Sequence, residues 1–186
     1  MRGMSIVLWL AVLGTTSCAS PMSGLTPIET ASSDTYQLGA GDEIRLTVDG
    51  FDNLTNTYNV GDEGTISVPM LSTVPVSGKS TRELEGLIAG MLKEKELAVD
   101  PSVSVQVLKY RPFFILGEVQ RPGQYPYVPG LTVLTAVSIA GGYTFRAETE
   151  AAAISRRIDG RTVTGRATQQ SSVQPGDTIY VHEAWF

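Results

Sequence analysis

The chain has 186 residues, enough for one domain or two small ones. With 42% hydrophobic and 18% charged residues, its composition is that of a globular protein and excludes a disordered chain. The formal net charge of −5 argues against a nucleic-acid partner, and no run of like charge forms a polybasic membrane patch.

The first 18 residues have the features of a signal sequence. Arg2 supplies a positive charge, and the apolar run 6–13 is shorter than the roughly 20 residues of a membrane-spanning helix. Small residues follow, and then Cys18, the only cysteine, which leaves no partner for an internal disulfide. This arrangement resembles the acylation site of a bacterial lipoprotein, although Thr15 stands where leucine is usual. The alternative is an ordinary cleaved signal with an incidental cysteine.

Acylation of Cys18 would attach the protein to a membrane without a spanning helix. By the same resemblance, Ala19 in place of Asp after the cysteine implies sorting to the outer membrane. Residues 19–34 are rich in Ser, Thr and Pro and lack periodicity, which predicts a flexible tether between anchor and fold.

Residues 35–110 predict short strands and one amphipathic helix. Ser80 and Glu83 fit a capping box, so a helix begins here, and its apolar residues recur at helical spacing to form one buried stripe. Alternation of apolar and polar residues predicts strands at 44–48, 65–69, 73–76 and 103–107.

Arg111-Pro112 breaks the chain, and a second small unit is predicted over residues 111–186. The Pro-Gly pair within 120–123 predicts a type II turn. Thr132 is expected to cap a short helix that Gly141-Gly142 ends in the left-handed conformation. Strands are expected at 113–119, 125–128, 152–158, 161–163 and 178–181, with Asp159-Gly160 as a hairpin turn.

One short pattern occurs twice in the chain. Segments 38–44 and 173–179 both read as a turn, Gly-Asp, one residue, Ile and a strand. Gly permits a positive φ, and Asp can accept hydrogen bonds from neighbouring backbone N–H groups to fix the turn. The pattern fits either two related modules or two independent junctions between a turn and a strand.

In their order and spacing these motifs resemble a known pair of modules. Segments 36–44, 62–69 and 100–105 resemble the polysaccharide export domain of outer-membrane exporter lipoproteins. Segments 117–125, 140–142 and 176–181 resemble the soluble-ligand-binding β-grasp module that follows it.

The resemblance implies an α+β fold. It predicts a small β-rich polysaccharide export domain with one main amphipathic helix, followed by a β-grasp-like domain. The chain then divides into a lipoprotein signal peptide (1–18), a flexible tether (19–34), the export domain (35–110) and the β-grasp domain (111–186).

The same resemblance implies a function in export and no catalysis, metal or cofactor. Copies of the chain would form a homo-oligomeric periplasmic ring, lipid-anchored at the outer membrane. The ring would guide a capsular or exopolysaccharide chain outward from an inner-membrane polysaccharide co-polymerase. The alternative is a periplasmic lipoprotein that binds a small soluble ligand or sugar through its β-grasp domain.

Long members of this family end in an amphipathic helix, and a ring of such helices forms the outer-membrane pore. Here the sequence stops five residues after the last predicted strand, at Phe186. We therefore expect a short form without that helix, served by a separate outer-membrane β-barrel.

Four side chains are candidates for contact with sugar or a partner. Tyr125 and Tyr127 lie on the same side of a predicted strand, where aromatic faces can stack on sugars or pack in a core. Arg156 and Arg157 lie beside the predicted hairpin with two further arginines, Arg161 and Arg166. A solvated face is the alternative for these arginines.

We predict no catalytic or metal-binding role for the single histidine or for the two acidic pairs. His182 is the only histidine and has no Cys or carboxylate cluster beside it in the sequence, so we expect a surface residue. The acidic pairs Asp42-Glu43 and Asp62-Glu63 would suit glycoside hydrolysis, but each lies at a Gly-containing turn, so we expect turn and capping roles.

Overall fold

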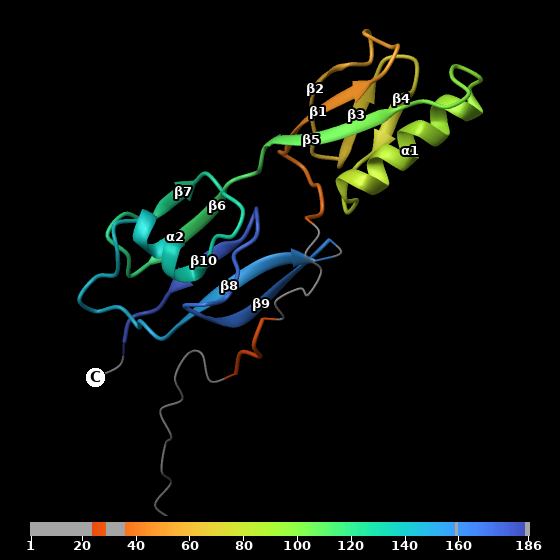
Figure 1. Cartoon of the computed structure of the whole chain (residues 1–186). Coiled ribbons are helices and arrows are strands. Elements are labelled where there is room, and N and C mark those ends of the chain that lie inside the picture. The colour runs from red at the N-terminus through yellow and green to blue at the C-terminus, as the bar shows by residue number, and fades with distance from the viewer. Residues whose placement is uncertain (1–23, 29–35, 159, 185–186) are drawn as a thin grey trace, which may run out of the picture.

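The computed structural model describes residues 24–28, 36–158 and 160–184 (Figure 1). The predicted signal peptide with Cys18, most of the predicted tether and the terminal Trp185-Phe186 pair lie outside these residues. The described chain forms two units, each around its own cluster of buried hydrophobic side chains. We call them the N-terminal unit (36–110) and the C-terminal unit (111–184).

The N-terminal unit packs one helix against short antiparallel strands (Figure 1). Its three-stranded sheet has the order β2-β1-β5, and β3 pairs with β4 in a separate hairpin. The elements are β1 (Glu43–Val48), β2 (Asn56–Asn59), β3 (Thr65–Val68), β4 (Ser72–Pro75), α1 (Thr81–Glu94) and β5 (Val103–Lys109).

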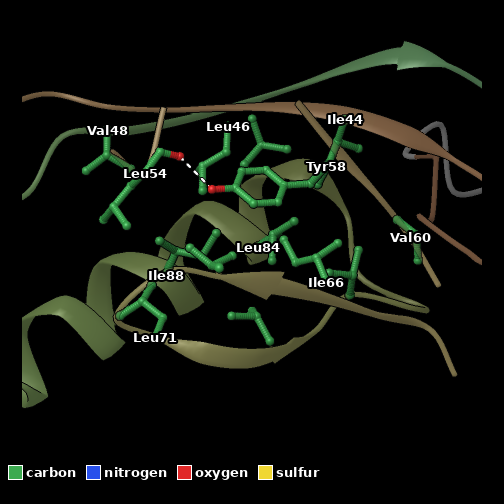
Figure 2. Close-up of a cluster of buried hydrophobic side chains, with 14 of the residues drawn as sticks. Ile44, Leu46, Val48, Leu54, Tyr58, Val60, Ile66, Leu71, Leu84 and Ile88 are labelled. Atoms are coloured by element: carbon green, nitrogen blue, oxygen red, sulfur yellow. Dashed lines mark hydrogen bonds between the residues drawn. The ribbon is translucent and has the colours of Figure 1, made fainter. Parts of the chain in front are cut away.

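Figure 2 shows the core between these elements. Leu84 and Ile88, on the apolar stripe of α1, face the sheet side chains and are fully buried. Tyr58 of β2 lies in the same core, and its hydroxyl donates to the carbonyl of Leu54 at 3.0 Å. The polar end of the tyrosine is thereby satisfied within the core.

The predicted capping box of α1 is present. The Glu83 amide donates to Ser80 Oγ at 3.2 Å, and the Ser80 amide donates to Glu83 Oε2 at 2.7 Å. These hydrogen bonds satisfy two donors at the start of the helix. The bonds that the carboxylate accepts from the Ser80 amide and hydroxyl lower the pKa of Glu83.

The C-terminal unit is a five-stranded mixed sheet with one short helix on its face (Figure 1). The strand order is β7-β6-β10-β8-β9, and the last strand, β10, lies parallel to β6 between it and β8. The elements are β6 (Phe113–Gly117), β7 (Gly123–Tyr125), α2 (Val133–Ile139), β8 (Ala151–Ile158), β9 (Arg161–Thr168) and β10 (Thr178–Val181). The expected α+β fold is confirmed.

Two local predictions are wrong. Strand β2 was not expected, because in its sequence NTYN only Tyr58 is apolar; its pairing with β1 creates the strand. The type II turn at 120–123 is absent, because Gly123 lacks the positive φ that such a turn requires and instead begins β7. The returning strand therefore spans 123–125 and not 125–128.

Part of the segment expected to be a flexible tether pairs with the fold. Pro27 forms a parallel bridge with Arg166 of β9. The Ile28 amide donates to the Arg166 carbonyl at 2.9 Å, and the Arg166 amide donates to the Thr26 carbonyl at 2.8 Å. Residues 26–28 thus extend the sheet beyond β9, and the structure differs here from the expectation. We call these three residues the N-terminal strap.

Neither helix in the described ranges is long and apolar enough to cross a membrane.

Candidate functional site: the junction between the two units

Arg111 is the first residue of the C-terminal unit and forms hydrogen bonds within both units. Its backbone amide donates to Asp42 Oδ1 at 2.8 Å, and one guanidinium nitrogen donates to Asp42 Oδ2 at 3.2 Å. The same nitrogen donates to the Tyr36 hydroxyl at 2.9 Å. On the other side, Nε donates to the carbonyl of Pro175 in the C-terminal unit at 3.0 Å. The planar guanidinium therefore fixes two turns at once.

Those two turns are the segments that share the repeated Gly-Asp pattern. Asp42 Oδ2 accepts the Gly39 amide at 2.8 Å, and Asp177 Oδ2 accepts the Gln174 amide at 2.7 Å. Both aspartates are fully buried, and the glycine before each has a φ near +90°. The two turns share one geometry, and each carboxylate fixes its own turn, as expected for Asp42.

Each buried aspartate is paired with an arginine. Asp42 is paired with Arg111, and Asp177 with Arg156, whose Nε and terminal nitrogen donate to the two carboxylate oxygens at 2.9 and 2.7 Å. Arg156 also donates to the Ser172 carbonyl at 3.1 Å. A bidentate pair of this kind satisfies a carboxylate that would be costly to bury alone.

Arg156 is therefore not available to a sugar or a partner. Its side chain is only 6% exposed, and the structure removes it from the four predicted contact residues. The prediction failed here because Asp177, the partner of the buried arginine, lies 21 residues away in the turn before β10. Arg157, the next residue, is exposed and remains a candidate.

The predicted tyrosines pack within the protein. Tyr127 is half-buried and meets Tyr110 edge to face at 5.4 Å, and Tyr110 meets Tyr36 in the same way at 4.9 Å. Tyr125 stacks on Phe113 at 6.0 Å between ring centroids. Tyr127 thus belongs to a row of three aromatic rings at the junction, and Tyr125 to the core of the C-terminal unit.

Burial dominates the electrostatics of Tyr36. Burial first, and then the hydrogen bond to Asp42, raise the pKa of its phenol well above the ordinary value of about 10. The guanidinium of Arg111 lies 5.6 Å from the centre of the ring and opposes this shift. The hydroxyl therefore stays protonated and continues to donate to the buried carboxylate.

Small residues make room for Arg111. A Cβ at Gly39 would collide with the guanidinium, and a Cβ at Gly176 would lie 2.9 Å from Nε. Both Gly-Asp turns can approach the arginine only because they carry glycine at these positions.

A cleft of about 560 Å³ opens beside Arg111 between the two units. The lining includes Gln37, Asp62 and Glu63 of the N-terminal unit. It also includes Arg157 and Gln174 of the C-terminal unit. Its lining is polar and carries both signs of charge. Within the described ranges, no three His, Cys, Asp or Glu residues are grouped to hold a metal ion. The ring of His182 packs instead against Tyr180, at 4.6 Å.

Arg111 was not predicted to be a functional residue, although Arg111-Pro112 was predicted to separate the two units. Its partners lie 69 and 64 residues away, in the two Gly-Asp turns. The repeated pattern was the available signal, since two identical turns with buried acids require two basic partners.

This two-unit arrangement agrees with the known families that the chain matches. Residues 30–108 match the family described as polysaccharide biosynthesis/export protein, and residues 112–167 match the SLBB domain. The chain therefore contains a polysaccharide export domain followed by an SLBB domain.

The individual relatives are named for exopolysaccharide production or polysaccharide export. The chain is 42% identical over 123 residues to the exopolysaccharide production protein ExoF of Rhizobium meliloti, covering 60% of this chain and 29% of ExoF. It is 29% identical over 139 residues to the EPS I polysaccharide export outer membrane protein EpsA of Ralstonia nicotianae, covering 60% of this chain and 36% of EpsA. The EpsA of Ralstonia solanacearum is 28% identical over the same length. The chain thus spans about a third of the length of these relatives.

Proposed function

We propose that this protein is a ring-forming periplasmic subunit of an exopolysaccharide export machine, lipid-anchored through Cys18 at the outer membrane. The observation that carries the proposal is the junction at Arg111, combined with the match to the export and SLBB families. A closed ring of identical subunits requires the same angle at every interface, so each subunit must hold its two units in one orientation. Arg111 and the row of three tyrosines supply that rigidity without any catalytic group.

The test is the phenotype of a strain that lacks the protein. We expect loss of secreted exopolysaccharide, with polymer held in the periplasm. The full chain, extracted in mild detergent, should run as a high-order oligomer on size-exclusion chromatography with light scattering. Normal secretion in the deletion strain, together with a monomeric protein, would contradict the proposal.

The partners are proposed on the same basis. We expect the ring to contact an inner-membrane polysaccharide co-polymerase and a separate protein that supplies the outer-membrane pore. Crosslinking in intact envelopes, followed by identification of the captured proteins, tests both contacts. Replacement of Cys18 by serine should release the protein from the membrane fraction if this residue carries the acyl chains.

A second candidate function is suggested by the cleft of about 560 Å³. Its polar lining, with Arg157 on one side and Asp62 and Glu63 on the other, suits the hydroxyl groups of a small sugar. In this reading the protein is a monomer that binds a soluble ligand. Titration with oligosaccharides from the exported polymer distinguishes the two functions, because saturable binding that Arg157→Ala abolishes, by a protein that stays monomeric, would favour the second.

A further inference from the structure

The outer face of the C-terminal sheet carries exposed apolar side chains. Along β6 and β10, alternate residues point to the core, and Phe114, Leu116 and Tyr180 point away from it. Their exposed fractions are 38, 44 and 45%. Leu116 lies directly beside Tyr180 in the parallel pairing, and neither strand contains a charged residue. We call these three side chains the sheet patch.

The opposite side of the same sheet is covered by α2 (Figure 1), whose exposed residues are Leu134 and Ile139 together with the uncharged polar Thr135 and Ser138, and exposed Val128 lies in the loop before the helix. Val128, Leu134 and Ile139 are 52, 39 and 41% exposed. Beside them lies an open hollow of about 430 Å³, lined by Val128, Pro129, Gly130, Leu131 and Ile139 and by the uncharged polar side chains of Thr135 and Ser138. We call the three exposed side chains and this hollow the helix patch.

The helix patch lies in a segment with an unusual composition. No Asp, Glu, Lys or Arg occurs between Arg121 and Arg146. Exposed helices of monomeric proteins normally carry charge on their outward face, whereas the centres of protein interfaces are depleted of it. The segment therefore has the composition of a surface that another protein covers.

The two patches differ in shape and lie on opposite faces of one small unit. A two-fold dimer buries the same patch of both copies and would leave the other patch exposed. A head-to-tail contact buries both patches, because large side chains of one copy enter the hollow of the next. Repetition of that contact produces a ring when its rotation closes.

We propose that the sheet patch of one copy docks on the helix patch of the next, and that this contact builds the ring. This inference rests on the proposed function, which requires a ring. It adds the two surfaces that form the contact between subunits and the head-to-tail arrangement of that contact.

Two single substitutions test the contact in the full chain in detergent. Leu116→Glu places a charge in the sheet patch, and Leu134→Glu places one in the helix patch. Leu134 lies in the first turn of α2, where an acidic side chain is compatible with the helix dipole, so the fold is retained. Val99→Glu is the matched control, since Val99 is 94% exposed and lies in the N-terminal unit.

Each patch variant alone should lose the high-order oligomer, and Val99→Glu should keep it. An equimolar mixture of the two patch variants should form heterodimers and nothing larger. In such a pair the intact helix patch of the Leu116→Glu chain meets the intact sheet patch of the Leu134→Glu chain, and the two remaining patches both carry the added charge. Light scattering measures the mass, and a tag on one variant confirms the composition.

Several results would overturn this inference while leaving the proposed function intact. One is that the wild type forms a ring and that both patch variants still form it. Another is an assembly that only one variant disrupts, which indicates a two-fold contact. A third is a variant that keeps its ring but stops polymer export, which assigns that patch to another protein. A wild-type protein that is itself monomeric would contradict the proposed function, and the inference would fail with it.

Discussion

At the scale of single residues, the buried acids of the two Gly-Asp turns are the most sensitive points of the molecule. Asp42 and Asp177 each satisfy backbone amides of their own turn, and each is neutralised by one arginine. Removal of the arginine leaves a buried carboxylate without its partner, and this is more destabilising than the loss of an exposed ion pair.

Replacement of Arg111 by alanine should lower the free energy of unfolding by about 2 kcal/mol. This is less than the roughly 3–5 kcal/mol expected for a fully buried pair, because the Arg111 side chain is 27% exposed. Urea denaturation followed by circular dichroism measures the change. Arg157→Ala is the control, because this neighbour of the junction is exposed and its removal should change stability by no more than about 0.5 kcal/mol. Equal losses in the two variants would contradict the assigned role.

Tyr36 should make the stability of the protein depend on alkaline pH. Its pKa is raised in the folded state, so the unfolded chain releases the phenolic proton first as pH rises. The stability that Tyr36 contributes is therefore fully present below the unfolded pKa of about 10 and is lost progressively above it. Denaturation series at about pH 9 and about pH 11 should show a smaller alkaline loss for Tyr36→Phe than for the wild type.

At the scale of elements, the contact between β6 and β10 depends on one glycine. Gly117 ends β6 with a φ of +86°, and a Cβ there would collide with the backbone carbonyl of Val181 in β10. Since β10 is the last strand and lies between β6 and β8, a shift of β10 would disturb both of its pairings.

Gly117→Ala should therefore destabilise the C-terminal unit by about 3 kcal/mol or more, because the collision adds to the strain of a positive φ. Gly130→Ala is the matched control: its φ is +82°, but the space around it is open. It should cost only about 1 kcal/mol. Thermal unfolding of the two variants compares them, and a similar loss in both would show that the approach of Val181 is unimportant.

The sequence predicted those elements whose signals are local. The capping box of α1, the alternation in β1 and the Gly-Gly end of α2 all involve residues within a few positions of one another, so the short segment alone determines the structure. Strand β2 was missed because its pairing with β1, and not its own composition, makes it extended. Arg156 was wrongly predicted to contact a sugar or a partner for the same physical reason, since its burial depends on Asp177, 21 residues away.

At the scale of the whole molecule, the junction should couple the unfolding of two separate cores. Gly39→Leu would occupy the space of the Arg111 guanidinium, while the side chains of both cores stay unchanged. In the wild type, we expect the slowest amide hydrogen-exchange rates of the two units to be similar. In the variant, we expect these rates to differ between the two units. Gly90→Leu, an equivalent change at an open position on α1, should leave the rates of the two units coupled. Unchanged coupling in Gly39→Leu would contradict a structural role for the junction.

The N-terminal strap sets a limit on where the C-terminal unit can sit. With acyl chains on Cys18, as proposed above, only residues 19–25 separate the lipids from Thr26, which is hydrogen-bonded to Arg166. Even fully extended, eight residue steps reach about 28 Å. The outer edge of β9 must then stay within that distance of the bilayer, so the SLBB unit is the one held close to the membrane and any applied tension is transmitted through its edge strand.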